Sequence, residues 1–118
     1  MECQVAVLAL VLAIGLTPCR AGAQEPVREP VDFQTHVEPI LRQHCWSCHS
    51  GDQMEGDLRL DQRSSILQGG SSGESIVVPY RPDESYLIRM VSGLADGKQM
   101  PPDDRLSFEQ IELLRQWI

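Results

Sequence analysis

The residues most capable of chemistry in this sequence are two cysteines three positions apart, followed directly by a histidine, in the stretch CWSCH. On a helical turn, residues at i and i+3 lie on the same side, so Cys45 and Cys48 present their thiols together. This spacing predicts covalent attachment of a c-type haem, with one thiol added to each vinyl group. His49 is then placed to bind the iron through one imidazole nitrogen, while its second nitrogen needs a hydrogen-bond acceptor.

Two other uses of these cysteines explain less of the pattern. A thioredoxin-like dithiol is expected to follow a strand, whereas the residues before Cys45 continue a helical pattern, and His49 would have no role. A structural zinc site needs four ligands, and only His36 and His44 accompany the motif. Haem attachment is the interpretation that uses all three residues of the motif.

Haem iron has a further coordination position, for which the sequence offers several candidates. These are Met54, Met90, Met100, His36 and His44. Met100 lies in a polar loop, GKQMPPDD, where no core packing explains it, and the two prolines after it stiffen the backbone. Met90 falls on an apolar helical stripe, where a methionine usually fills the core. We therefore predict Met100 as the distal ligand, in the His/Met pattern of cytochromes c.

The sequence predicts that these residues are positioned by an all-α fold with three to four helices and long loops. A first helix runs into the motif, because apolar residues recur at helical spacing from Phe33 to Leu41. Thr35 and Glu38 are expected to form its capping box. Pro39 then falls at the fourth helical position, where it removes one early hydrogen bond and introduces a small kink.

Three helical segments are expected after the motif. A short one spans Gln62–Gln68 and is stopped by two glycines. The next has Pro82 near its start and Gly93 as its C-terminal cap. The last begins with a capping box of Ser107 and Gln110. Its expected buried face comprises Phe108, Ile111, Leu114, Trp117 and Ile118. No strand of convincing length is found, since SIVV is short and is followed by proline.

Length and charge limit the possible functions. The 118 residues suit one small domain, with little room for a second. The formal charge of -7 and the lack of basic clusters argue against nucleic-acid binding. A charged protein partner is therefore expected to offer a basic face.

The N-terminus reads as an export signal. Val5–Leu16 is an apolar run too short to span a bilayer, and small residues precede a cleavage site before Gln24. We expect a signal peptide over residues 1–23, a polar linker over 24–31 and an exported domain, periplasmic or extracytoplasmic, with no stable membrane span after cleavage. Because the other two cysteines, Cys3 and Cys19, fall in this signal, no disulfide framework is expected in the mature chain.

Over nearly all of residues 32 to 118 the sequence resembles the planctomycete-type cytochrome c domain. The motifs that carry the resemblance are CWSCH, LRLD, GG, IVVP, PDESYLI, MPP and LS..QI.LLR.WI. The resemblance implies a small cytochrome c-like fold, with Cys45, Cys48, His49 and Met100 as haem residues. Such domains typically head larger exported proteins, and family members usually continue past Ile118. The chain is therefore expected to be the N-terminal fragment of a larger protein, with its haem domain truncated at the C-terminus.

The expected function is one-electron transfer by a single covalently bound haem, not enzyme catalysis. Its expected partners are redox proteins or fused downstream domains. The alternative is a haem enzyme, such as an oxidase or peroxidase-like subunit, whose sixth iron position is open. A third possibility is a non-catalytic dithiol or metal-binding module.

Overall fold

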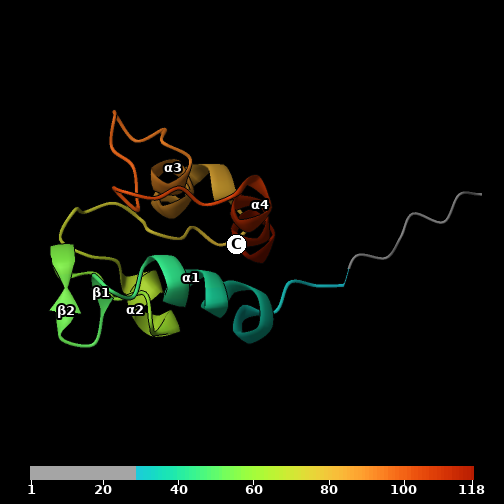
Figure 1. The fold of residues 1–118 in the computed structure, drawn as a ribbon, viewed down its shortest axis with the longest axis horizontal. Helices are drawn as coiled ribbons and strands as arrows, with labels where there is room; N and C mark the ends of the chain where they lie inside the picture. Colours follow the sequence, from blue (N-terminus) through green and yellow to red (C-terminus); the bar gives the residue numbers. More distant parts are fainter. Residues whose placement is uncertain (1–28) are drawn as a thin grey trace, which may run out of the picture.

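The computed structural model describes residues 29–118, in which α1 and α2 form one layer and α3 and α4 a second (Figure 1). The elements are α1 (Glu38–His44), β1 (His49–Ser50), β2 (Gln53–Met54), α2 (Arg63–Gln68), α3 (Tyr86–Val91) and α4 (Phe108–Trp117). A π-helical turn, Phe33–Val37, precedes α1, and 3₁₀ turns span Glu55–Asp57 and Pro82–Glu84. The chain is mostly helical, as expected. Its only sheet within the described residues is the hairpin β1–β2, which the sequence did not predict.

The first helical segment begins earlier than expected. Asp32 is its N-cap, and the Asp32 carboxylate accepts a hydrogen bond from the N–H of Thr35 at 2.8 Å. The predicted capping box of Thr35 and Glu38 is therefore wrong, because a carboxylate upstream already caps the turn. Pro39 has no N–H to donate, and the turn before it takes the wider π form, with the N–H of Glu38 bonded to the carbonyl of Phe33.

The stretch SIVV lies alongside the start of α3. The first two N–H groups of α3 donate to the carbonyls of Ser75 and Ile76, at 3.0 Å each. Ser85, directly before α3, is fully buried. Its hydroxyl accepts from the N–H of Val78 and donates to the carbonyl of Arg81, both at 2.9 Å. The bonds to the Ser75 and Ile76 carbonyls satisfy the first two N–H groups of α3, which begins after Ser85 and not near Pro82 as predicted.

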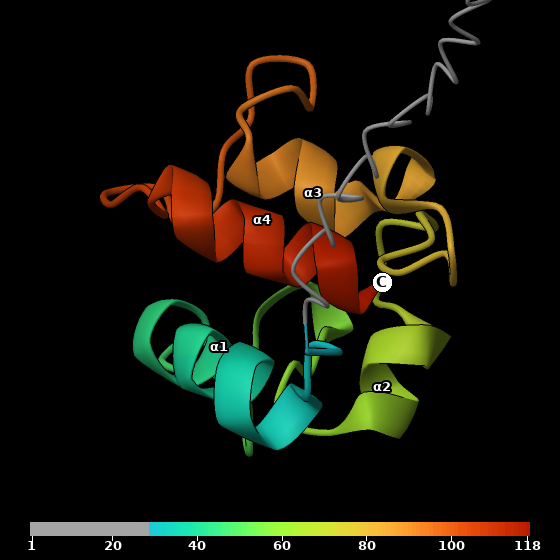
Figure 2. The same ribbon diagram turned by 90° about the vertical axis from the view of Figure 1, so that its right-hand side faces the viewer.

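The last helix, α4, has the predicted capping box, in which the side chains and backbones of Ser107 and Gln110 bond reciprocally. It lies between α3 and the first helical segment (Figure 2), where the rings of Phe33 and Trp117 are 5.3 Å apart. Phe108 is 75% exposed, so its predicted burial is wrong. Helical side chains lean toward the N-terminus, and a side chain at the first position extends beyond the packed part of the helix.

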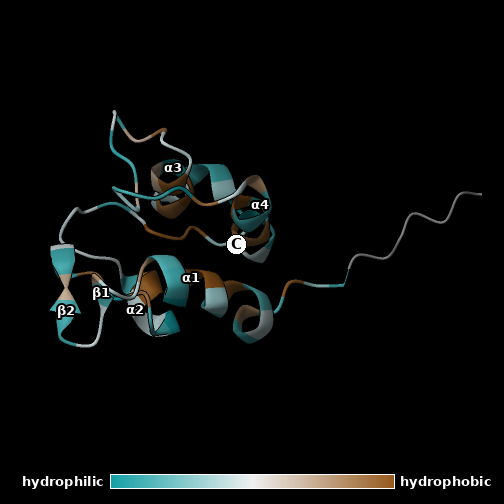
Figure 3. Cartoon of the chain, in the orientation of Figure 1, coloured by the Kyte–Doolittle hydropathy of each residue, from teal (hydrophilic) through white to brown (hydrophobic). Residues whose placement is uncertain are grey.

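The apolar core lies where the two layers face each other (Figure 3). Its fully buried members from different elements are Val37, Leu41, Ile66 and Leu114. The short predicted helix near residues 62–68 is confirmed, and Gly69 ends it with a positive φ of 82°. No helix within residues 29–118 has the length and hydropathy needed to cross a bilayer. The expected signal peptide and most of the expected linker lie outside the described residues.

Candidate functional site

A cavity of about 540 Å³ lies between the two layers, and the CWSCH motif forms one of its walls. Its volume falls in the range of small-molecule and cofactor sites, about 300–1,000 Å³. Most of its lining is apolar, contributed by Leu58, Leu60, Ile76, Tyr86, Leu87, Met90, Val91, Pro101 and Pro102. Such a surface is suited to a large apolar ligand with a few polar anchoring points.

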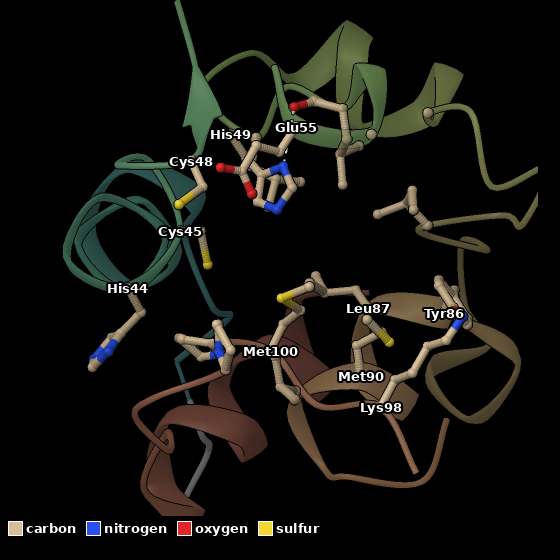
Figure 4. A pocket seen from close by; sticks show the side chains of 18 of the residues that line it. His44, Cys45, Cys48, His49, Glu55, Tyr86, Leu87, Met90, Lys98 and Met100 are labelled. Atoms are coloured by element: carbon tan, nitrogen blue, oxygen red, sulfur yellow. Dashed lines mark hydrogen bonds between the residues drawn. The ribbon is translucent and has the colours of Figure 1, made fainter. Parts of the chain in front are cut away.

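Both cysteines of the motif face this cavity (Figure 4). The N–H groups of Cys48 and His49 donate to the carbonyl of Cys45, at 3.2 and 2.9 Å, which closes the turn after α1. Both thiols are free. Burial, with a smaller contribution from Cys48, raises the pKa of the Cys45 thiol to about 11. Redox-active dithiols have a lowered cysteine pKa and follow a strand, so this environment does not favour a thioredoxin-like role.

The imidazole of His49 is oriented by the backbone of the LRLD motif. Nδ1 of His49 lies 3.3 Å from the carbonyl oxygen of Leu58. Because a carbonyl only accepts, Nδ1 carries the proton and Nε2 keeps its lone pair for a ligand in the cavity. The carbonyl of His49 accepts from the N–H of Leu60 at 2.7 Å, and the carbonyl of Leu60 accepts from the indole N–H of Trp46 at 3.1 Å. The acceptor that the sequence could not identify is therefore the carbonyl of Leu58.

Three contacts hold the LRLD segment and the residues beside it in place. The Arg59 guanidinium hydrogen-bonds the carboxylate of Asp61 at 2.8 Å, which lowers the pKa of Asp61, and the same carboxylate accepts from the N–H of Gly51 in the hairpin. Gly70 approaches so closely that an added Cβ would lie 2.5 Å from the carbonyl oxygen of Gly56. Sequence reasoning missed the roles of the Gly51 N–H and of Gly70, because backbone groups and close approach leave no signature in side-chain chemistry.

The opposite wall of the cavity carries two methionines. Figure 4 shows Met100 facing His49 across the cavity, with Met90 beside it. The N–H of Met100 donates to the carbonyl of Met90 at 3.1 Å, so the loop that carries Met100 is tied to α3. Met90 is half-buried and lines the cavity, although its apolar stripe predicted core packing. The structure thus brings together Cys45, Cys48, His49 and Met100.

Of the other candidate ligands, Met54 and His36 do not line the cavity, whereas His44 does. Nε2 of His44 is 3.1 Å from the side-chain nitrogen of Gln110, and Nδ1 is 3.3 Å from the Asp104 carboxylate. The side-chain oxygen of Gln110 is held by its capping box, so its NH₂ group faces His44 and donates to it. Both nitrogens of His44 are therefore occupied. His44 joins α1 to α4 through Gln110 and to the loop that carries Met100 through Asp104.

The zinc alternative finds little support in the arrangement of side chains. Within residues 29–118, no group of three or more His, Cys, Asp or Glu side chains is placed to hold a metal ion. A structural zinc site uses four such ligands.

Comparison with known families identifies one match. The family model described as Planctomycete cytochrome C matches residues 45–104, which is just over half of the chain. The match begins at the first cysteine of CWSCH and extends past Met100. Neither the curated proteins nor the solved structures contain a significant match to this chain.

Proposed function

This chain belongs to the planctomycete cytochrome C family, and from that premise we propose that it is a one-electron carrier with a single covalently attached haem. The observation that carries the proposal is that one cavity is lined by both cysteines of CWSCH, by His49 and by Met100. The residues present fit the group. Two free thiols lie side by side, one imidazole keeps a nitrogen lone pair, a thioether lies opposite it, and the remaining walls are largely apolar.

In this proposal, Cys45 and Cys48 form thioether bonds to the haem, and His49 and Met100 bind its iron. When bound, the haem supplies an iron that takes up and releases one electron. The Leu58 carbonyl fixes the tautomer of His49 and makes the lone pair on its Nε2 a stronger ligand for iron. The apolar walls keep water away, and a thioether at the sixth position favours the ferrous state and raises the reduction potential.

We also propose that the domain works outside the cytoplasm. The support is the apolar run Val5–Leu16 and the small residues after it, which suit a cleaved signal over residues 1–23. A linker over 24–31 then precedes the haem domain over 32–118, and redox proteins or downstream domains exchange electrons with it.

Attachment is tested by producing the chain together with haem-maturation machinery. We expect haem to stay with the polypeptide through acid–acetone extraction and denaturing electrophoresis. Changing both Cys45 and Cys48 to Ala is expected to abolish this retention, whereas Ser47→Ala, between them, is the matched control and is expected to keep it. Complete extraction of haem from the unaltered chain would overturn the proposal.

The same haem-loaded protein can be used to distinguish an electron carrier from a haem enzyme. With Met100 on the iron, no position is open, so carbon monoxide should bind slowly and peroxide should not be turned over. Rapid binding of carbon monoxide together with peroxide turnover would instead support an oxidase or peroxidase-like subunit.

A further inference from the structure

Two of the acidic residues that line the cavity, Glu55 and Asp104, lie at the end where the cysteines are. The N–H of Glu55 donates to the carbonyl of Cys48 at 3.0 Å, which places Glu55 beside the motif. The carboxylate of Asp104 lies 3.3 Å from His44, the residue before Cys45. The carboxylates therefore give this end of the cavity a negative potential.

The opposite end carries a cation. Among the described residues that line the cavity, Lys98 is the one lysine or arginine, and it is the only lysine in the whole sequence. Figure 4 shows its side chain extending toward Tyr86, on the side of the cavity away from the cysteines. The charge distribution of the cavity thus runs from acidic at the cysteine end to basic at the Tyr86 end.

The backbone of Lys98 is held in place. Its N–H donates to the carbonyl of Ala95 at 2.8 Å, and Ala95 is almost completely buried. The next fixed point is Met100, whose N–H is bonded to α3. No carboxylate of residues 29–118 lies within ion-pair distance of Lys98, although most arginines in this range have such a partner. Lys98 is therefore an exposed cation on a fixed backbone, without a protein counter-ion in the described part of the chain.

The two edges of a haem differ in a way that matches this distribution of charge. Its two vinyl groups are on two adjacent pyrroles, and its two propionates are on the other two. When Cys45 and Cys48 hold the vinyl edge, the propionate edge faces the other end of the cavity. A propionate there meets a cation, whereas the reverse orientation would set propionates against Glu55 and Asp104.

We propose that Lys98 is the counter-ion of a haem propionate and positions the haem edge opposite the two cysteines. This inference rests on the proposed function, since it assumes the covalently attached haem. Lys98 acts through charge: it offsets the propionate, and the positive potential near the iron favours the ferrous state. Lys98 is thus a positioning residue that raises the reduction potential.

The inference is tested on the haem-loaded protein with three variants. Lys98→Gln removes the charge and Lys98→Arg keeps it. Arg63→Gln removes a charge from an exposed residue that does not line the cavity and has no ion-pair partner among residues 29–118. We expect Lys98→Gln to lower the midpoint potential, and Lys98→Arg to restore most of it. Arg63→Gln should leave the potential close to that of the unaltered protein. Redox-difference infrared spectra should show shifted propionate carboxylate bands in Lys98→Gln alone.

Equal potentials and unchanged carboxylate bands in Lys98→Gln and Arg63→Gln would overturn the inference. If the Lys98→Gln variant loses its methionine-to-iron absorption band, the charge of Lys98 is instead removed by acetylating the folded, unaltered protein. The acetylated Lys98→Arg variant is the control, because its N-terminal amine is acetylated while its charge at position 98 remains. A midpoint potential that acetylation lowers in the unaltered protein but not in Lys98→Arg supports the counter-ion, and equal potentials in the two acetylated samples overturn it. Loss of covalent haem from the unaltered chain would refute the proposed function itself, so the two failures are distinguishable.

Discussion

Two methionines on the same wall of the cavity differ in what holds them. Met90 is part of α3, and its position follows from the packing of that helix. Met100 sits in a loop that approaches α3 through one backbone hydrogen bond and then continues into two prolines. Loop residues held by a rigid scaffold commonly carry function, which favours Met100 as the ligand.

We predict that Met100→Ala opens the sixth position of the iron. The variant should lose the sulfur-to-iron charge-transfer band, bind carbon monoxide much faster and have a lower midpoint potential, because the thioether favours ferrous iron. Met90→Ala is the control, and we expect it to keep the band while losing about 1–2 kcal/mol of unfolding free energy, since its side chain is only half-buried. Loss of the band in Met90→Ala alone would assign the ligand to Met90.

Gly70 is a second single residue on which the site depends, because neighbouring atoms leave no room for a side chain there, whereas its backbone angles would allow one. A Cβ at Gly70 would lie 2.5 Å from the Gly56 carbonyl and 3.0 Å from the Leu58 side chain, and Leu58 orients His49. We predict that Gly70→Ala costs about 2–3 kcal/mol of unfolding free energy, as overpacking does, and shifts the haem absorption spectrum.

Gly73→Ala is the matched control for this substitution. Gly73 has a φ of +75° and open space around it, so its change is expected to cost about 1 kcal/mol through backbone strain and to leave the spectrum unchanged. Equal melting temperatures and equal spectra for the two variants would contradict the steric argument for Gly70. Thermal unfolding followed at the haem band measures both quantities.

At the scale of elements, the hairpin β1–β2 and the LRLD segment form one unit around the motif. Asp61 bonds to the Arg59 guanidinium within its own segment and to the N–H of Gly51 in the hairpin. The hairpin is too short to be stable alone, so these bonds determine where His49 lies.

Asp61 gives this unit a defined response to pH. The pKa of Asp61 is lowered in the folded state, mainly by the hydrogen bond from Arg59. Its contribution is therefore complete above the unfolded pKa of about 3.9 and is lost as the pH falls through the lower folded value. We predict that Asp61→Asn lowers the unfolding free energy at pH 7 by about 0.5–1 kcal/mol and flattens the loss of stability in acid.

The measurement is the melting temperature at a series of pH values between neutral and strongly acidic. Glu74→Gln, at an exposed residue with no ion-pair partner within residues 29–118, removes the same charge and should leave the acid dependence unchanged. Parallel curves for the unaltered protein and Asp61→Asn would show that this carboxylate does not contribute.

The helices were predictable because their signals are local, whereas the assignment of haem residues stays a prediction, for which the structure shows a shared cavity. The capping box of α4 and the glycine stop of α2 are set by neighbouring residues, and the two cysteines, His49 and Met100 were chosen by residue type and spacing. The carbonyl of Leu58 was not predictable, since every residue has one and only the fold selects which one meets the imidazole. The exposure of Phe108 likewise depends on how far the packed part of α4 extends.

The whole molecule is acidic, and this affects its encounters with other molecules. The sequence carries 17 acidic and 10 basic residues, giving a formal charge of -7. Long-range attraction raises association rates for oppositely charged partners and weakens as salt screens it. A basic redox partner is therefore expected to dock faster than an acidic one.

We predict opposite salt dependences for two small redox reagents. Electron exchange with a cationic cobalt complex should slow as ionic strength rises, whereas exchange with an anionic iron cyanide complex should accelerate. Stopped-flow absorbance of the haem band measures both rates. Reversed directions, with the cationic reagent accelerating and the anionic one slowing as salt is added, would mean that a positive local potential at the electron-transfer site, and not the overall charge, governs the encounter.

The two walls of the cavity have a consequence for the order of events during maturation. Residues 44–60 supply the cysteines, His49 and the backbone bonds that orient it, whereas Met90 and Met100 arrive from a later part of the chain. Contacts between residues close in sequence form sooner than distant ones. Under the proposed function, a maturation enzyme would therefore attach haem to the first wall while it is still an accessible peptide, and the second wall would close afterwards. The attached haem would then provide the surface on which the later half of the domain packs.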